Sequence, residues 1–350
     1  MARWRAAITR WFERRWYGEA TPNLVLRWLA CGFEGVARHR RRRYLVAVSA
    51  GGDAITRRAG VPVIVVGNLA VGGAGKTPLV IALVNALRMR GWRPGVISRG
   101  YGRATDDVRR VRVDSTPAEV GDEPLLIAGN SKAPVAVAAR RIEAARLLVE
   151  SGEVDVLVAD DGLQHYGLMR DVEILVIDGQ RRFGNARMVP AGPLREPIER
   201  AAACDFIVCN GGSAQEGEVP MQLELGDAVA LAGGERRSLA SFAGVRVHAV
   251  AGIGNPERFF TALGAEGLSI MPHAFADHHD FSAADLDFAD GAPLLMTEKD
   301  AVKCARFAQA NWFAVPAQAR LPESFYDALS TRLATHGHVT HEHPSSPNDP

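Results

Sequence analysis

The chain has 350 residues, of which 47% are hydrophobic and 23% are charged, and its formal net charge is +1. This is the composition of an ordinary soluble protein, and the length allows two hydrophobic cores. No apolar run is long enough to predict a transmembrane helix, the N-terminus has no secretory signal pattern, and the four cysteines form no C-x-x-C pair typical of zinc or redox sites.

The first 50 residues differ from the rest of the chain in charge and in aromatic content. They contain 11 arginines and three glutamates, a net charge of +8, which leaves −7 for the remaining residues. Four of the six tryptophans also lie there, at Trp4, Trp11, Trp16 and Trp28. Basic and aromatic side chains together favour docking on an anionic membrane surface. The alternatives are a solvated helix face and a nucleic-acid partner, and the tryptophans and leucines favour the membrane over nucleic acid.

A glycine-rich sequence, AVGGAGKT, follows the apolar run from Val61 to Val66 and precedes an apolar-periodic helix. Strand, glycine loop and helix in this order are typical of a nucleotide phosphate cradle. In such a cradle backbone N–H groups surround phosphate oxygens, the lysine reaches the terminal phosphates and the next hydroxyl binds Mg²⁺. The first glycine of the usual G-x-x-x-x-G-K-[ST] pattern is Ala70 here. We expect a nucleoside triphosphate to contact Ala70, Val71, Gly72, Gly73, Ala74, Gly75, Lys76 and Thr77, with Lys76 catalytic and Thr77 a metal ligand.

Short apolar runs alternate with helical patterns after this loop. We expect strands at Pro94–Ser98, Pro134–Ala138, Val154–Ala159, Glu173–Ile177 and Asp205–Cys209, and a crossover helix over residues 140–150. This alternation predicts a P-loop NTPase-like α/β/α sandwich, in which helices cover both faces of a largely parallel sheet.

Two aspartates, Asp160 and Asp161, follow the strand that ends at Ala159. A P-loop enzyme needs an acid that holds the metal at the end of a neighbouring strand. We therefore expect Asp160 to bind the metal and Asp161 to take part in catalysis. The alternative for adjacent aspartates is turn or helix-cap chemistry.

The composition changes at residue 211, and a second α/β pattern begins at Val245. Its strands are expected at residues 268–271, 293–296 and 312–315, and Gly252 and Gly254 predict a structural turn because they complete no glycine motif. The last residues are rich in His, Pro and Ser, a composition that forms no core. The predicted segments are a basic N-terminal segment 1–50, a P-loop domain 51–210, a β linker 211–244, a smaller α/β domain 245–325 and a disordered tail 326–350.

Seven sequences narrow the function further. They are GNLAVGGAGKTP from Gly67, SRGYGR from Ser98, GDEP from Gly121, DDGLQH from Asp160, PAGPLREP from Pro190, FADHHDF from Phe275 and TEKDAVK from Thr297. In this set and order, over about residues 20 to 320, the chain resembles the tetraacyldisaccharide 4′-kinases, the lipid A 4′-kinases.

The resemblance implies transfer of the γ-phosphate of ATP, with Mg²⁺, to the 4′-hydroxyl of a tetraacylated glucosamine disaccharide 1-phosphate, which gives lipid IVA. It implies two α/β/α domains with the site in their cleft, joined by a β linker. It also implies an N-terminal helix that lies on the cytoplasmic face of the inner membrane as a peripheral anchor. The charge and the tryptophans of the first 50 residues point to the same surface.

A sugar hydroxyl is a poor nucleophile at neutral pH, so a carboxylate or an imidazole should orient it or accept its proton. Asp122 and His278 are the candidates, and the resemblance implies that they act as a catalytic pair near the γ-phosphate. Domain closure would bring His278 to the site. A turn residue and a helix cap or core histidine are the alternatives.

Further residues in these motifs are candidates for ligand contacts. Arginine forms bidentate phosphate contacts and an aromatic ring packs on sugar, although a surface salt bridge is the alternative for each arginine. We expect Gln164 to contact the nucleotide, and we expect the acceptor to contact Arg99, Tyr101, Arg103, Glu123, His165 and Arg195.

Two other functions stay open at this point. A membrane-associated P-loop switch or metallochaperone-type GTPase explains the P-loop and Asp160 equally well, but not Asp122 with His278. Lys299 and Asp300 in TEKD do not have the spacing of a guanine-reading N-K-x-D, so selectivity for GTP is not supported. The third reading is a nucleotide-binding scaffold without catalysis.

Overall fold

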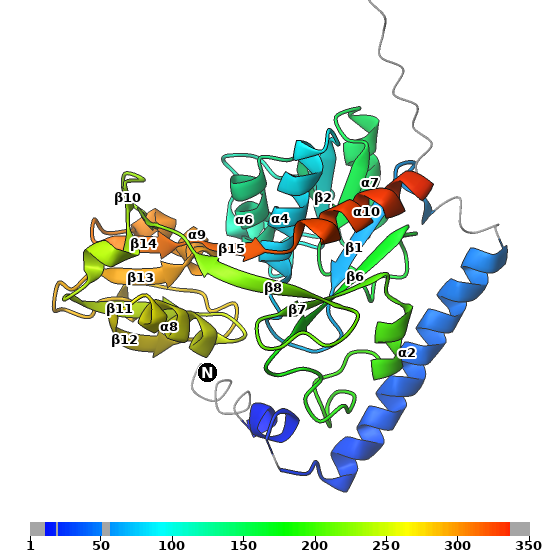
Figure 1. Cartoon of the computed structure of the whole chain (residues 1–350), viewed down its shortest axis with the longest axis horizontal. Helices are drawn as coiled ribbons and strands as arrows, with labels where there is room; N and C mark the ends of the chain where they lie inside the picture. The colour runs from blue at the N-terminus through cyan, green and yellow to red at the C-terminus, as the bar shows by residue number, and fades with distance from the viewer. Residues whose placement is uncertain (1–10, 19, 51–56, 337–350) are drawn as a thin grey trace, which may run out of the picture.

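The computed structural model describes residues 11–18, 20–50 and 57–336 (Figure 1). Within these residues a large α/β unit carries a nine-stranded sheet, and a smaller unit beside it carries a six-stranded sheet. One long helix, α2 (Leu24–Ala50), lies along the outer side of the large unit. The fold is therefore of the predicted α/β class.

The large sheet is parallel apart from its two edges. Its order is β15-β8-β7-β6-β1-β5-β2-β4-β3, and only β15 and β3 run antiparallel to their neighbours. All residues of β1, β2, β4 and β5 are buried, as expected of parallel strands that are covered on both faces. The strands are β1 (Val63–Gly67), β2 (Pro94–Ser98), β3 (Arg109–Arg110), β4 (Val135–Val137), β5 (Val156–Ala159), β6 (Val172–Asp178), β7 (Phe206–Asn210), β8 (Glu218–Leu225) and β15 (Ala317–Arg320).

Helices cover both faces of this sheet. One face packs against α4 (Lys76–Met89), α6 (Asp122–Ser131) and α10 (Glu323–His336), and the other packs against α7 (Arg141–Glu150) and the inner side of α2. In α4 the side chains of Leu79, Leu83 and Leu87 are buried. Their four-residue spacing places them on one helix face, toward the sheet. A short helix, α5 (Pro117–Val120), precedes α6.

The small unit repeats this arrangement on a smaller scale. Its sheet has the order β10-β9-β14-β13-β11-β12, with a hydrophobic cluster on each face. The strands are β9 (Ala228–Ala230), β10 (Arg236–Arg237), β11 (Arg246–Ala251), β12 (Ser269–Ala274), β13 (Leu294–Thr297) and β14 (Trp312–Val315), and the helices are α8 (Pro256–Ala265) and α9 (Glu298–Cys304). Short 3₁₀ helices lie at Leu239–Phe242, Ala283–Asp285 and Ala305–Phe307, and the large unit has one at Ile198–Ala203.

The two units are more interwoven than the predicted segments imply. The expected linker 211–244 contributes β8 to the large sheet and β9 and β10 to the small one. The chain then returns from the small unit, and β15 and α10 pack on the large one (Figure 1). The predicted segments are therefore not separate units, because β15, which follows the small unit in the chain, pairs with β8 of the large sheet.

The tail that we expected to be disordered from residue 326 is helical as far as His336. The side chains of Phe325, Leu329 and Leu333 are buried in the core of the large unit. Their spacing of four residues forms one apolar stripe, which the polar composition of the tail as a whole conceals. Residues 337–350 lie outside the described part of the chain.

The N-terminal segment packs on the large unit with one face. In α2 the inner side chains are Leu26, Ala30, Ala37 and Tyr44, whereas Trp28 is 79% exposed on the opposite side. Residues 11–16 are also helical, and Trp16 Nε1 donates a hydrogen bond to the Pro190 carbonyl at 3.1 Å. Across the described ranges, no helix combines the length and the apolar character that crossing a membrane requires.

Candidate active site

A cavity of about 1020 Å³ lies between the large and the small unit. Residues 70–77 line it, together with residues that follow β2 and β5, residues of α8 and the loop that carries His278. The carboxyl ends of parallel strands are where open α/β sheets bind ligands. The cavity is therefore at the expected place for the nucleotide and for a second substrate.

The glycine loop before α4 has the backbone that phosphate binding requires. Gly72 and Gly75 have φ angles of 115° and 90°, which favour glycine. A Cβ atom on Gly75 would lie 2.2 Å from Nδ2 of Asn210, whose side chain donates to the Ala74 carbonyl. Neither the backbone angle nor the available space accepts a side chain at Gly75.

The structure also explains why Ala70 can replace the first glycine of the pattern. Ala70 forms an antiparallel bridge with Leu194, and the Val71 amide donates to the Pro193 carbonyl at 2.8 Å. Ala70 is not among the residues with positive φ, so a Cβ atom is accepted there. The PAGPLREP sequence therefore holds the entrance of the P-loop in place.

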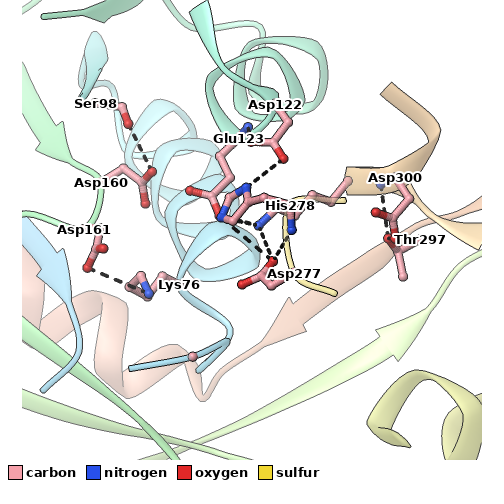
Figure 2. Close-up of polar contacts among 12 residues, drawn as sticks. Lys76, Ser98, Asp122, Glu123, Asp160, Asp161, Asp277, His278, Thr297 and Asp300 are labelled. Carbon is pink, nitrogen blue, oxygen red and sulfur yellow. Dashed lines mark hydrogen bonds and ion pairs between the residues drawn. The ribbon is translucent and has the colours of Figure 1, made fainter. Parts of the chain in front are cut away.

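The P-loop lysine, Lys76, pairs with Asp161 in the structure. Its Nζ lies 3.8 Å from Asp161 Oδ1 (Figure 2), and it donates to Asn68 Oδ1 at 3.3 Å. Two nitrogens of Arg195 contact the Asp161 carboxylate at 3.0 and 3.2 Å. Burial alone would raise the pKa of Asp161, but the charges of Lys76 and Arg195 outweigh it and hold the pKa low. Asp161 is thus an ionised anchor for two cations.

Asp160 has a different environment from its neighbour. Its Oδ2 accepts from Ser98 Oγ at 3.4 Å, whereas Oδ1 is buried and has no hydrogen-bond partner among the described residues. Burial, together with the negative charges of Glu123 and Asp161, raises the pKa of Asp160. A buried carboxylate oxygen without a partner is costly unless a cation or a proton satisfies it. Asp160 therefore offers a metal ligand at the cavity wall.

Asp122 and His278 meet across the cleft between the two units. His278 Nδ1 lies 3.2 Å from Asp122 Oδ2, and Figure 2 shows the imidazole pointing at the carboxylate. Asp122 is at the N-terminus of α6, and its Oδ1 accepts from the Glu123 amide at 2.9 Å. Burial opposes the charge of Asp122, but the hydrogen bond from His278 and the charges of Lys299 and Lys303 lower its pKa to about 2. The carboxylate is ionised at every physiological pH.

The ring of His278 is fixed from several sides. The hydrogen bond with Asp122 raises the pKa of His278, and Lys299 Nζ lies 3.4 Å from Nε2. The ring of Tyr101 lies 4.9 Å from the imidazole, centroid to centroid. His278 also has a φ angle of 58°, in the left-handed region, and such strain in a non-glycine residue is typical of functional sites.

Two lysines of α9 belong to this site and were not predicted. Lys299 Nζ contacts Glu123 Oε1 at 2.9 Å and Asp277 Oδ1 at 3.2 Å. Lys303 Nζ lies 3.7 Å from Asp122 Oδ2. The two lysines are four residues apart, a spacing that places them on one face of a helix, and this spacing was the signal in TEKDAVK. Asp300, between them, is buried and accepts from Thr297 Oγ1, from the Gly252 amide and from Lys303 Nζ, so it holds Lys303 in place.

The other predicted contact residues divide into two groups. Arg99, Tyr101, Glu123, Gln164, His165 and Arg195 line the cavity. Gln164 is held by its own contacts, because Nε2 donates to the Asn68 carbonyl at 3.2 Å and to Glu196 Oε2 at 3.0 Å. Arg103 is placed elsewhere: it does not line the cavity, and its buried guanidinium donates to the Asp107 carbonyl at 2.6 Å.

Comparison with known proteins agrees with this geometry. The family model described as LpxK, tetraacyldisaccharide-1-P 4′-kinase, matches residues 22–334. The tetraacyldisaccharide 4′-kinase of Stenotrophomonas maltophilia (strain R551-3) is 51% identical over 328 residues, which covers 91% of this chain and 95% of the relative. That of Xanthomonas axonopodis pv. citri (strain 306) is 53% identical over 294 residues and covers 79% of this chain and 84% of the relative.

A solved structure extends the similarity to the whole fold. The crystal structure of LpxK from Aquifex aeolicus in complex with ATP has a TM-score of 0.71, with 27% sequence identity, and the match covers 87% of this chain and 97% of that chain. The predictions of the α/β fold, the family and the enzyme activity are thus confirmed, and the GTPase switch and the inactive scaffold are set aside. The chain belongs to the tetraacyldisaccharide 4′-kinase family, the kinases of lipid A biosynthesis.

Proposed function

We propose that the cleft transfers the γ-phosphate of ATP to the 4′-hydroxyl of a tetraacyldisaccharide 1-phosphate and so forms lipid IVA. The observation that carries this proposal is the contact between Asp122 of the large unit and His278 of the small unit. Of this pair, His278 lines the cavity together with the P-loop, and Asp122 is buried behind it. ATP is the nucleotide bound in the Aquifex aeolicus relative. The P-loop amides and Lys76 would receive its phosphates.

In the proposed reaction the 4′-hydroxyl oxygen forms a bond to the γ-phosphorus while the bond from that phosphorus to the bridging oxygen of ADP breaks. ADP leaves with that oxygen, and the hydroxyl proton passes to the Asp122 carboxylate. A carboxylate with a pKa of about 2 is a weak base. In phosphoryl transfer the hydroxyl proton leaves late, so orientation of the acceptor is the larger part of the task. Asp122 therefore orients the hydroxyl first and receives its proton as the new bond forms.

His278 keeps Asp122 in this role. Because Lys299 lies next to Nε2 and Asp122 accepts at Nδ1, the tautomer with the proton on Nδ1 fits both contacts. In this tautomer the Nδ1–H group donates to Asp122 and fixes the direction of its carboxylate. The loop carrying His278 belongs to the small unit, so the pair forms only when the two units are together.

The site also fits Mg²⁺. The unpartnered Oδ1 of Asp160 and the hydroxyl of Thr77, in the first turn of α4, both belong to residues that line the cavity, and oxygen ligands are those that Mg²⁺ prefers. When bound, the ion would neutralise charge on the β- and γ-phosphates. Asp161 would hold the side chains of Lys76 and Arg195 in position through its ion pairs with them.

We further propose that α2 docks on the cytoplasmic face of the inner membrane, where an acylated substrate would lie. Its outward side chains Leu24, Val25 and Trp28 are 70, 66 and 79% exposed. The basic cluster, residues 38–43, begins just past the middle of the helix. An apolar face combined with arginines fits an anionic bilayer better than it fits water or nucleic acid. Of the other tryptophans, Trp16 packs on the large unit instead, and Trp4 lies outside the described residues.

The test is a phosphate-transfer assay with radiolabelled ATP and tetraacyldisaccharide 1-phosphate in detergent micelles. Label should move into the lipid in the presence of Mg²⁺, and a parallel reaction with labelled GTP measures the nucleotide preference. The Lys76→Ala variant is the negative control, since it removes the P-loop charge. Release of labelled inorganic phosphate without any labelled lipid would contradict the proposal.

A further inference from the structure

One arginine of α2 lies at the open edge of the cavity, where its side chain stays exposed to solvent. Arg40 is among the residues that line it. Arg40 lies three residues after Ala37 and four before Tyr44, and both of these pack against the large unit. Residues at these spacings share a face of a helix. The inner face of α2 thus carries a charge at the point where the helix passes the cleft.

The turn after Arg40 is firmly attached. The ring centroids of Tyr44 and Tyr166 are 5.1 Å apart, and the guanidinium of Arg170 lies 5.0 Å from the centroid of the Tyr44 ring. Tyr166 in turn donates to the buried Glu196, which also accepts from Gln164. This series of contacts fixes the position of α2, and with it the backbone of Arg40, relative to the site.

The surroundings of Arg40 hold an excess of positive charge. Burial and then the nearby guanidinium groups lower the pKa of His165 to about 3, so its ring is neutral. The groups that act on it are Arg141, Arg170, Arg99 and Arg40. Arg141 donates to the carbonyls of Asp160 and Asp161, not to a carboxylate. Arg170 is paired with Glu173 at 3.2 Å, and carboxylates, among them those of Glu123, Asp160 and Asp161, also line the cavity. Among the described residues neither Arg40 nor Arg99 forms an ion pair, so these two arginines are the ones available to an anionic ligand.

The acceptor supplies a suitable anion. The name of the family specifies a disaccharide that already carries a phosphate at position 1, whereas the phosphates of the nucleotide belong to the P-loop. We propose that Arg40, together with Arg99, binds the 1-phosphate of the acceptor and makes the enzyme specific for a phosphorylated disaccharide. This inference rests on the proposed function, because it assigns a residue to the second substrate of the same site.

The neighbouring arginines of α2 provide a matched control. Arg38 is bonded to Glu34 one turn earlier on the helix. Arg42 is exposed and does not line the cavity, and two residues along a helix place it on nearly the opposite side from Arg40. Arg40→Gln and Arg42→Gln therefore change the net charge equally, but only the first removes a group from the cleft.

The experiment measures kcat and KM with two acceptors in detergent micelles, the tetraacyldisaccharide 1-phosphate and the same lipid without its 1-phosphate. The parent enzyme should prefer the phosphorylated acceptor. Arg40→Gln should raise the KM for that acceptor about 10- to 100-fold, the range of one charge-assisted hydrogen bond to an anion, with a small change in kcat. It should leave the KM for the dephosphorylated lipid and for ATP unchanged. Arg40→Lys should lie between parent and Arg40→Gln, and Arg42→Gln should keep the parent's ratio between the KM values for the two acceptors.

The other outcomes overturn the inference in distinguishable ways. An equal loss of Arg40→Gln on both acceptors, or an equal preference of the parent for both, would show that Arg40 does not read the 1-phosphate. A raised KM for ATP would assign Arg40 to the nucleotide. An equal loss in Arg42→Gln would show a general charge effect at the micelle surface. A parent that phosphorylates neither lipid would contradict the proposed function itself.

Discussion

Replacing Asp122 with asparagine is the most direct perturbation of the proposed chemistry, because it removes one charge and keeps the shape of the side chain. The pKa of Asp122 is about 2, below its ordinary value of 3.8. At 1.36 kcal/mol per pH unit, the folded site stabilises this carboxylate by about 2 kcal/mol despite its burial. His278, Lys299 and Lys303 provide that stabilisation, so the site is built to hold a charged group at this point.

We expect Asp122→Asn to lower kcat by about 10² to 10⁴, the usual range for a positioned acid or base. Binding of ATP should be nearly unchanged, because Asp122 does not belong to the P-loop. His278→Gln should lower kcat in the same direction, and the double variant should be less than about tenfold worse than Asp122→Asn alone. The reason is that the proposed role of His278 is exercised through Asp122, so the two residues act as one unit.

The assay is initial-rate phosphate transfer at saturating ATP and acceptor, with ATP affinity measured separately by equilibrium binding. Asp280→Asn is the matched control: Asp280 is an exposed acid two residues from His278 in the same loop, and its loss should have little effect. A folded Asp122→Asn enzyme with a kcat within about threefold of the parent would refute the catalytic assignment. If the losses of the two single variants multiply fully in the double variant, Asp122 and His278 act independently and the proposed catalytic pair is refuted.

Three further predictions concern the phosphates, pH and the membrane. Lys76→Ala and Asp160→Ala should each nearly abolish transfer, because they remove charge that stabilises the migrating phosphoryl group. Asp160→Ala should also weaken Mg²⁺ binding measured by calorimetry. Near-normal rates in folded variants would contradict the assignment of these two residues to the active site. The pKa of His278 is raised in the folded protein, so the contribution of His278 to stability should be complete below pH 6.5 and decline above it. The Tm difference between parent and His278→Gln should therefore be larger at pH 6 than at pH 9. A difference that is constant or grows with pH would contradict this role of His278. Trp28→Glu should reduce co-sedimentation with anionic vesicles and raise the KM for vesicle-borne acceptor more than for micellar acceptor. The reason is that burying one large apolar side chain is worth about 1.5–3 kcal/mol. Equal vesicle binding by parent and variant would indicate that α2 is a solvated helix.

Most of the large sheet could be predicted from the sequence because its strands are buried on both faces. Such strands are continuous apolar runs, and the predicted Pro94–Ser98 coincides with β2. The P-loop was also predictable, since its glycines, Lys76 and Thr77 are adjacent in the chain. What periodicity could not provide was the return of β15 and α10 to the large unit, because their partners, β8 and α4, are distant in sequence.

The same limit applies to the site. The sequence indicated Asp122 and His278 separately, but no spacing relates residues that are 156 positions apart. Lys299 and Lys303 were overlooked because their importance depends on that cleft and not on α9 itself. Likewise, the segment from Arg38 to Arg43 contains five arginines that the sequence alone does not distinguish. Only the structure shows that Arg40 is the one among them that lines the cavity.

The two faces of α2 connect the proposed membrane docking with acceptor recognition. Trp28 and Arg40 lie on different sides of α2 and are twelve residues apart, which corresponds to about 18 Å along the helix axis. In the proposed arrangement the acyl chains of the acceptor stay in the membrane on which α2 docks, while the 1-phosphate contacts Arg40 and the distal sugar reaches Asp122. Because Tyr44 and Ala37 hold the helix against the large unit, the proposed membrane contact and the phosphate contact would be positioned by one rigid element rather than by independent loops.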